Sequence, residues 1–337
     1  MIYYLVTRPG DHTFRNNPIV VDEPRLKGRF EIVIYQDAFE KRRWRGGTVI
    51  FSDIDRLPAQ AAMRAAVLYE RLAQSSAIRL LNHPTRSCRR FGFLRRLKRA
   101  GINRHDVFRA DEMPASMKFP VFVRSETEHD GAYTELLHDE ATLRLEVDRL
   151  VALGTLPQNL LISEYCHTAD ADGVWRKATG YLIGDIIFQR YLFFGDHWQV
   201  KQPRTGNVAA IRDEAAMLAE EEAYATGDTY VPMIREAARI GGFGFGRMDF
   251  DIGGGKPEFW ECNTNPVPAM LSFATQGARS ERILPRGWQQ LRDALAALDN
   301  EAAHQTEIEI QPVARYEDLY RDMLKDARER ANLPPPE

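Results

Sequence analysis

The segment 246–268, GRMDFDIGGGKPEFWECNTNPVP, concentrates acidic and amide side chains within an apolar stretch. Its aromatic and other apolar residues predict two β-strands, over 246–252 and 257–263, and the glycines between them predict a hairpin turn. Carboxylates inside an apolar strand need a reason, because burying a charge is unfavourable unless the charge is paired or binds a cation. The segment therefore favours a cation site over a solvated surface hairpin.

The alternation of side chains along the two strands sorts these residues into faces. Arg247, Asp249 and Asp251 share one face of the first strand. Glu261 and Asn263 share one face of the second strand. If the acidic faces coincide, two carboxylates and an amide oxygen lie side by side. Magnesium prefers such hard oxygen ligands and usually binds through one or two carboxylates together with substrate phosphates.

The run GFGRMDFD, followed by FWECNTNP, resembles the C-terminal signature of the ATP-grasp enzymes. The pattern is most similar to that of the D-alanine–D-alanine ligases and related carboxylate–amine ligases. This resemblance implies that Asp249, Glu261 and Asn263 hold two Mg²⁺ ions, which bridge the phosphates of ATP. It also implies that Arg247 stabilises the oxyanion of the reacting carboxyl group.

Two segments in the middle of the chain resemble phosphate-binding elements of the same family. The segment PVFVRSE (120–126) resembles a strand whose lysine contacts an ATP phosphate, and here Arg124 stands at that position. An arginine can also bind phosphate, through a planar fork of donors rather than a point charge. The segment HDGAY (129–133) resembles the glycine-rich flap of the family and contains only Gly131.

The segment LLISEYC (160–166) resembles the hinge between the two ATP-binding lobes of the family. By this resemblance, Glu164 contacts the amino edge of adenine. Tyr165, Cys166 and His167 are then expected to line the hinge. The resemblance as a whole covers about half of the chain and implies that ATP is a substrate.

The remaining nucleotide contacts stay open between several residues. An acidic residue shortly after the hinge usually holds the ribose, and both Asp170 and Asp172 meet this description. The family also supplies a second cation to the phosphates, for which Arg176, Arg190 and Lys201 are the candidates. Lys201 is preferred, followed by Arg190, and each of the three can also be a solvated surface charge.

Short apolar runs alternate with a helical pattern at the start of the chain. The runs over 2–7, 30–36, 47–53 and 78–82 predict strands, and a stripe of apolar residues predicts a helix over 58–74. This alternation is typical of an α/β protein with an open parallel sheet. The N-terminal part therefore matches the domain that precedes the ATP-binding lobes in the ATP-grasp family.

We thus expect an α/β protein with the ATP-grasp fold, in which the two ATP-binding lobes are of α+β character. The N-terminal parallel-sheet domain is expected over 1–112, and the central lobe with the flap and hinge over 113–190. The C-terminal lobe with the metal site is expected over 191–300, and a helical tail over 301–337.

The composition narrows the class of protein. The formal net charge of −3 over 337 residues disfavours a nucleic-acid-binding protein. There is no apolar run long enough for a transmembrane helix and no signal peptide, so we expect a cytoplasmic protein without a membrane partner. The three cysteines form no CxxC pair, which argues against a zinc or disulfide framework. The basic run 86–99 is either a solvated helix face or a surface for RNA or an anionic substrate.

The resemblance implies an ATP-dependent ligase that joins a small-molecule carboxylate to an amine through an acyl phosphate and releases ADP. An amino acid or short peptide is the kind of substrate that the family suggests, and a homodimer is a common state. Specificity is expected in the N-terminal domain and in the loops 202–210 and 266–280. Two alternatives are a small-molecule kinase and an ATP-binding regulatory protein with a degenerate site. The arginine at position 124 and the glycine-poor flap favour the latter slightly.

Overall fold

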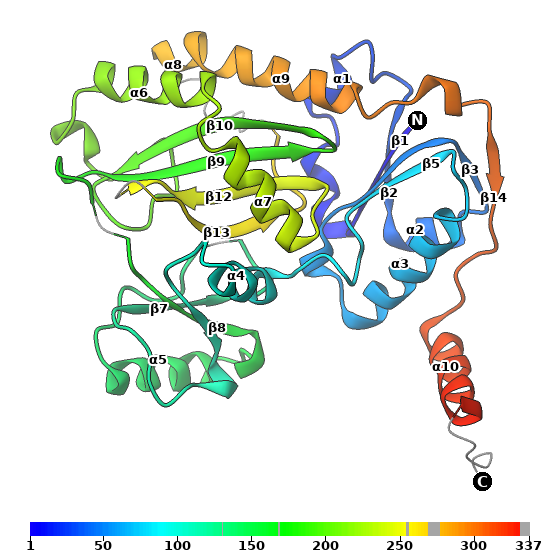
Figure 1. Ribbon diagram of the computed structural model, residues 1–337, viewed down its shortest axis with the longest axis horizontal. Helices are drawn as coiled ribbons and strands as arrows, with labels where there is room; N and C mark the ends of the chain where they lie inside the picture. Colours follow the sequence, from blue (N-terminus) through cyan, green and yellow to red (C-terminus); the bar gives the residue numbers. More distant parts are fainter. Residues whose placement is uncertain (130, 168, 254–255, 269–276, 331–337) are drawn as a thin grey trace.

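The computed structural model describes residues 1–129, 131–167, 169–253, 256–268 and 277–330. Within these ranges the chain forms an N-terminal domain, a small central lobe and a larger C-terminal lobe (Figure 1). The glycine turn expected between the two acidic strands lies partly outside the described residues. Parts of the expected flap and of the 266–280 loop also lie outside them.

The N-terminal domain contains a four-stranded parallel sheet. Its strands are β1 (Ile2–Val6), β2 (Phe30–Ile34), β4 (Gly47–Phe51) and β5 (Ile78–Leu81), in the order β2-β1-β4-β5. Every residue of β1 and β4 is buried. This is expected of parallel strands that are covered on both faces. The open parallel sheet predicted from the sequence is therefore confirmed.

Helices from different parts of the chain cover the two faces of this sheet. On one face, α2 (Tyr35–Glu40) and α3 (Ala59–Leu72) contribute apolar side chains to the main core. On the other face, α1 (Pro18–Val21) and α9 (Leu284–Ala296) pack against β1 and β4. Since α9 follows the C-terminal lobe in the chain, its packing fixes that lobe against the N-terminal domain.

The central lobe is a three-stranded antiparallel sheet with one helix. The sheet has the order β6-β8-β7, where β6 is Val107–Arg109, β7 is Val121–Ser125 and β8 is Leu160–Glu164. The helix α5 (Glu140–Ala152) buries its apolar stripe on this sheet. Its N-terminus is capped by Asp139, whose carboxylate accepts a hydrogen bond from the backbone of Thr142.

The C-terminal lobe is built on a five-stranded sheet of order β11-β10-β9-β12-β13. Its longer strands are β9 (Trp175–Ile183), β10 (Ile186–Gly195), β12 (Phe245–Asp251) and β13 (Glu258–Asn263), and β11 (Arg204–Thr205) is a short edge strand. Helices α6 (Glu214–Thr226) and α7 (Val231–Gly241) pack on β9 and β10. Figure 1 shows α8 (Gly277–Arg282) and α9 on the side of β10. The boundary expected at residue 190 falls inside β10.

Three elements join these units or extend from them. The basic helix α4 (Arg90–Arg99) lies between the lobes and contacts β13, β6 and α7. The C-terminal part, expected to be helical, first forms the strand β14 (Glu307–Glu309), which pairs with β3 (Arg43–Arg45) of the N-terminal domain. The helix α10 (Tyr316–Arg330) then extends away from the sheets (Figure 1).

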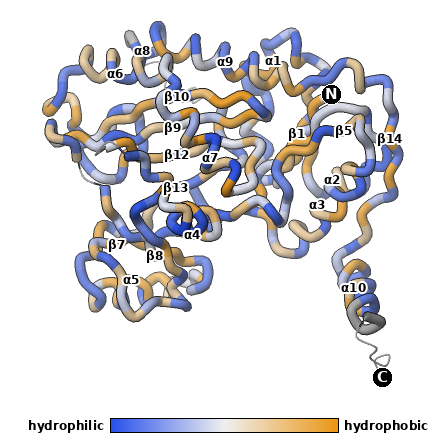
Figure 2. The backbone as a smooth tube through the Cα atoms, viewed as in Figure 1, coloured by the Kyte–Doolittle hydropathy of each residue, from blue (hydrophilic) through white to orange (hydrophobic). Residues whose placement is uncertain are grey.

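The distribution of hydropathy follows this arrangement. Figure 2 shows hydrophobic backbone concentrated in β1 and in the strands of the C-terminal sheet, and mainly hydrophilic backbone in α4. Among the helices that the structure describes, none combines the length and the apolar character of a membrane span.

Candidate active site

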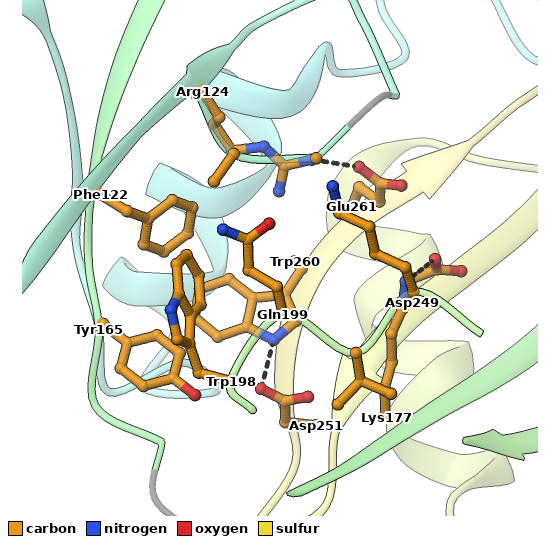
Figure 3. Close-up of a pocket in the computed structure, with 14 residues that line it drawn as sticks. Phe122, Arg124, Tyr165, Lys177, Trp198, Gln199, Asp249, Asp251, Trp260 and Glu261 are labelled. Atoms are coloured by element: carbon orange, nitrogen blue, oxygen red, sulfur yellow. Dashed lines mark hydrogen bonds and ion pairs between the residues drawn. The ribbon is translucent and has the colours of Figure 1, made fainter. Parts of the chain in front are cut away.

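A cavity of about 100 Å³ opens between the sheet of the central lobe and the sheet of the C-terminal lobe. Side chains from β7, β9, β12, β13 and the 198–201 loop line it (Figure 3). One end of the cavity is aromatic and the other end is charged. The two ends have different chemistry and are described in turn.

Two buried carboxylates define the charged end. Strands β12 and β13 are antiparallel, and their register places Asp249 opposite Glu261 and Arg247 opposite Asn263. The acidic faces of the two strands therefore coincide. Asp249 is 2% exposed and Glu261 is 7% exposed. Charges as deeply buried as these need close partners.

Asp249 obtains its partners from the C-terminal sheet itself. Nε of Arg247 lies 2.7 Å from Oδ1 of Asp249, and Nζ of Lys177 lies 2.8 Å from Oδ2. Burial alone raises the pKa of Asp249, but the charges of Arg247 and Lys177 outweigh burial and hold the pKa below its ordinary value. Asp249 is therefore ionised at neutral pH.

Glu261 obtains its partners from three other elements. Arg124 at the end of β7 donates to Oε2 at 2.7 Å, and Arg90 at the start of α4 donates to the same oxygen. Nδ1 of His129 lies 3.5 Å from Oε1, and its Nε2 lies 2.7 Å from a carboxylate oxygen of Asp55 in the N-terminal domain. Burial raises the pKa of Glu261, but these cations lower it well below its ordinary value.

The donor set fits a divalent metal ion. The two ionised carboxylates face each other across one strand pair, and the amide of Asn263 lies two residues along β13 from Glu261. Oxygen donors of this kind suit Mg²⁺. Arginine and lysine side chains balance the two carboxylates, so the same site also presents cations to an anion such as a phosphate.

The aromatic end is formed by Phe122, Tyr165, Trp198 and Trp260. The rings of Tyr165 and Trp260 lie nearly parallel, with centroids 6.0 Å apart, and the ring of Trp198 lies 5.0 Å from that of Phe122. Figure 3 shows the four rings gathered on one side of the cavity, away from Asp249 and Glu261. Such flat apolar surfaces suit a planar base, because every base has a π-face that can stack on them.

A β-bulge explains why Trp260 belongs to this group. Asp249 pairs with Glu261 and Phe250 pairs with Phe259, so Trp260 is an extra residue in β13. The bulge lets Trp260 and Glu261 line the same cavity although they are adjacent in sequence. Nε1 of Trp260 donates to Asp251 at 2.7 Å. Burial nevertheless raises the pKa of Asp251 to about 7.

Besides Asp249 and Glu261, four of the expected nucleotide-binding residues line the cavity, namely Arg124, Gly131, Tyr165 and Lys201. Gly131 has a positive φ of 103°, and a Cβ there would lie 2.9 Å from Cε of Lys201. A side chain at position 131 would therefore be strained and would collide with the lysine. Arg247 and Asn263 lie on the neighbouring strand positions beside the cavity.

Three of the hinge residues are placed differently from the expectation. The carboxylate of Glu164 accepts hydrogen bonds from the backbone N–H groups of Asp106, at 3.0 Å, and Lys118, at 2.8 Å. The expected contact of this side chain with adenine is therefore corrected: Glu164 joins strands of the central lobe. Cys166 and His167 also lie outside the cavity lining. Burial raises the pKa of Cys166 to about 12 and lowers that of His167 to about 4.

The candidates for the ribose and second phosphate contacts are also corrected in part. Asp172 accepts hydrogen bonds from Arg176 and Arg212, and Arg176 also bonds Asp170 and Glu220. This ion network satisfies those groups outside the cavity. Arg190 packs over the ring of Tyr191 and against Gly287 of α9, so it does not reach a phosphate in this cavity.

Sequence reasoning missed the roles of Lys177, Trp198, Trp260, Arg90 and His129. Lys177 could have been found only with the pairing of β9 and β12, which places it opposite Asp251. Arg90 lies in the basic run that was interpreted mainly as a solvated face, yet its side chain is only 3% exposed. Because several lysines and arginines follow Arg90 in α4, nothing in the local sequence distinguishes this buried arginine from the exposed ones.

Comparisons with known proteins bear on the fold. No protein-family model matches the sequence, and no curated protein matches it either. Among solved structures, the D-alanine–D-alanine ligase from Coxiella burnetii matches with a TM-score of 0.50 at 10% identity, over 97% of this chain and 98% of that chain. The chain therefore has the ATP-grasp fold.

Two further solved structures match at lower TM-scores. The RimK domain ATP-grasp protein from Sphaerobacter thermophilus matches with a TM-score of 0.48 at 14% identity, over 89% of this chain and 99% of that chain. The D-alanine–D-alanine ligase from Bacillus anthracis, complexed with ATP, matches with a TM-score of 0.47 at 12% identity and the same coverage of both chains.

Proposed function

We propose that this protein is an ATP-dependent carboxylate–amine ligase that forms an acyl phosphate and releases ADP. One observation carries the proposal. A single cavity in an ATP-grasp fold has an aromatic end and a charged end, where cations accompany two opposed buried carboxylates. The aromatic end suits the base of a nucleoside triphosphate, and the charged end suits its phosphates together with a metal ion.

Each part of the cavity has a role in this proposal. The rings of Tyr165 and Trp260 hold the adenine, and Arg124, Lys177 and Lys201 bind the phosphates. Asp249, Glu261 and Asn263 would hold Mg²⁺, which neutralises charge on the transferred phosphoryl group. Two of the cations that pair with the carboxylates, Arg124 and Lys177, line the cavity in which the phosphates would lie.

The reaction proceeds in two steps. An oxygen of the substrate carboxylate attacks the γ-phosphorus, the bond to the β-phosphate oxygen breaks, and an acyl phosphate and ADP form. An amine then attacks the acyl carbon, loses a proton, and displaces phosphate as the amide forms. Arg247, whose guanidinium group pairs with Asp249 on β12, would stabilise the oxyanion of the second step by its positive charge. Neither step needs a protein nucleophile.

The proposal is tested by incubating the protein with Mg-ATP, a panel of amino and other carboxylic acids, and hydroxylamine as a general amine. ADP, AMP and hydroxamate are measured together. The proposal expects ADP and a hydroxamate in equal amounts with at least one acid. ADP with a phosphorylated product and no hydroxamate would favour a kinase, and AMP would contradict an acyl phosphate. Tight binding of Mg-ATP without turnover would favour a regulatory protein.

Variants at the two carboxylates test the metal site, and a variant at Asp172 is the matched control. Asp249→Asn and Glu261→Gln are expected to lower turnover by about 100-fold or more, because each removes a carboxylate that would hold the Mg²⁺ needed to neutralise the transferred phosphoryl group. Asp172→Asn, which alters a carboxylate outside the cavity, is expected to leave the KM for ATP unchanged. A rise in that KM would restore Asp172 as a ribose contact.

A further inference from the structure

Arg190 is a fully buried cation without a hydrogen-bond acceptor. It lies on β10 and is 1% exposed. None of its three guanidinium nitrogens has a hydrogen-bond partner, and no other buried arginine among the described residues lacks partners for its whole guanidinium group. Its one close contact of electrostatic character is with the ring of Tyr191, 4.5 Å from the guanidinium carbon. A protein rarely buries such a charge unless something else compensates it.

The fold makes room for this unpaired group. Gly287 lies inside the helix α9, and a Cβ built there would lie 0.9 Å from Nη1 of Arg190. Glycine inside a helix is itself destabilising, because it adds backbone entropy to the unfolded chain. Two unfavourable features thus occur at one place, and packing alone does not account for them. An apolar side chain at position 190 would remove both disadvantages.

Arg190 packs against Gly287 of α9, and α9 packs with Tyr181 on the face of the sheet that also carries Lys177. A bulge in β10 interrupts the pairing with β9 between Gln189 and Tyr191, and Arg190 lies at this bulge. The amide of Gln189 bonds the backbone of Tyr224 in α6. Arg190 instead points to α9 and packs on Tyr191. It is therefore directed away from α6.

Tyr181 on the intervening strand β9 connects Arg190 to Arg247. Tyr181 pairs with Phe188 of β10 on one side and with Arg247 of β12 on the other. Burial raises the pKa of the Tyr181 phenol to about 12, while the charges of Arg247 and Arg190 both act to lower it. The charges of both guanidinium groups therefore act on one phenol. Their strands are separated by two strand spacings, or roughly 10 Å.

We propose that Arg190 anchors a second carboxylate of the acid substrate, whose reacting carboxyl group lies at Arg247. This inference rests on the proposed ligase function and names its substrate class: an acid with two carboxylates, such as an amino dicarboxylic acid. The planar guanidinium fork suits a carboxylate because it can donate two parallel hydrogen bonds. In the structure the side chain rests on Gly287. A phosphate is another anion that a guanidinium group binds, so the test separates the two anions.

The first test measures melting temperatures without nucleotide, in acetate, succinate, L-glutamate and phosphate at matched ionic strength. Arg190→Met is compared with the wild type and with Arg176→Met. The control arginine is also buried, on β9, but is paired with Asp172 and Glu220. Without added anion, Arg190→Met is expected to melt no lower than the wild type, and Arg176→Met is expected to melt lower, because only Arg176 has ion pairs to lose.

The change in melting temperature caused by each anion decides whether Arg190 binds a carboxylate. Succinate or glutamate should raise the melting temperature of the wild type and of Arg176→Met more than acetate does, and should leave Arg190→Met unchanged. Equal responses of the wild type and Arg190→Met would overturn the site. A response of the wild type to phosphate alone, or to none of the four anions, would overturn the assignment to a carboxylate.

A kinetic test separates this inference from the ligase proposal. With the acid that gives a hydroxamate, Arg190→Met should raise the KM for the acid by about 10-fold or more, and leave the KM for ATP unchanged. An unchanged KM for the acid, together with normal hydroxamate formation, would overturn the role of Arg190 and leave the ligase proposal standing. A silent hydroxamate assay would contradict the ligase proposal, and the melting experiment would still test the anion site.

Discussion

At the scale of single residues, the site depends on charges that are buried together. Asp249 and Glu261 remain ionised because Arg247, Lys177, Arg124 and Arg90 surround them. If Mg²⁺ bound the two carboxylates, the cations around them could pair with the phosphates of a nucleotide. No buried charge would then lose its partner. The same argument, applied to an arginine without a partner, leads to the anion site at Arg190.

Lys177 gives a direct test of the charged end of the cavity. Lys177→Met is expected to raise the KM for ATP by about 10-fold or more, because it removes a charged donor to a phosphate. Steady-state kinetics with varied ATP measures this effect. Arg176→Met, one position along β9 and outside the cavity, is the control and should leave the KM unchanged. Equal KM values for Lys177→Met and the wild type would remove Lys177 from the site.

At the scale of elements, polar side chains join the lobes that form the cavity. Asn82, just after β5, is buried and adopts the left-handed conformation with a φ of 59°. Its side-chain amide donates to the carbonyl oxygens of Phe51 and Phe245, and its oxygen accepts from the backbone N–H groups of Gly244 and Phe245. One residue thus joins the N-terminal sheet to the first residue of β12.

Substitutions of Asn82 should separate the contribution of its hydrogen bonds to stability from the effect of its left-handed backbone conformation. Asn82→Ala is expected to lower the free energy of unfolding by about 3 kcal/mol or more, because four hydrogen bonds are lost in a buried place. Asn82→Gly loses the same bonds but tolerates the left-handed conformation, so it should be about 1 kcal/mol more stable than Asn82→Ala. Urea unfolding measures both values. If the alanine variant were the more stable one, the conformational argument would fail.

Glu258 at the start of β13 predicts a pH dependence of stability. Burial raises its pKa, but hydrogen bonds from His105 and Arg104 outweigh burial and lower the pKa to about 2. A pKa depressed in the folded state stabilises the protein above the unfolded value, near 4.5, and this stabilisation is lost as the pH falls toward 2. The expected contribution at neutral pH is about 3 kcal/mol.

The variant Glu258→Gln tests this dependence. The free energy of unfolding of the wild type should exceed that of the variant by a constant amount above about pH 5, and the difference should shrink below pH 4.5. Urea unfolding between pH 3 and pH 8 measures it. A difference that stayed constant down to pH 3 would show that the ionised carboxylate is not the source of the stability.

At the scale of the whole molecule, the C-terminal part has two sections with different roles. The section with β14 pairs with β3, and Val313 is 2% exposed against the N-terminal domain. In α10, the exposed fractions of Tyr320, Met323 and Leu324 are 47%, 54% and 47%. The first section is therefore part of the N-terminal domain, whereas α10 buries little apolar surface.

Two truncations test this division. Removal of 316–337 is expected to change the melting temperature by less than about 3 °C and to leave turnover unchanged, because little buried surface is lost. Removal of 301–337 also deletes β14 and Val313 and should lower the melting temperature by several times that amount. Thermal unfolding followed by circular dichroism measures both. A large effect of the shorter truncation would assign α10 to the folded core.

Local sequence patterns were enough to predict much of the fold and the acidic part of the site. Alternation along two strands was enough to place Asp249, Glu261 and Asn263 near one another, and apolar runs were enough to predict the parallel sheet. Both depend on neighbours in sequence. The coincidence of the two acidic faces follows from the hairpin, which is itself a local structure.

The remaining features depend on contacts between distant segments. Lys177 reaches Asp249 only because β9 pairs with β12, and Trp260 joins the cavity only because of a bulge. Glu164 is directed to backbone amides that lie about fifty residues earlier in the chain. Strand pairing, bulges and such long-range hydrogen bonds leave no periodic signal in the sequence.

The most direct test of the central claim follows oxygen from the acid to phosphate. The acid that supports hydroxamate formation is labelled with ¹⁸O in its reacting carboxyl group and incubated with Mg-ATP and hydroxylamine. An acyl phosphate intermediate predicts that each inorganic phosphate released carries one ¹⁸O from the acid, which is measured by the isotope shift in ³¹P NMR. Unlabelled phosphate, formed together with the hydroxamate, would contradict the account.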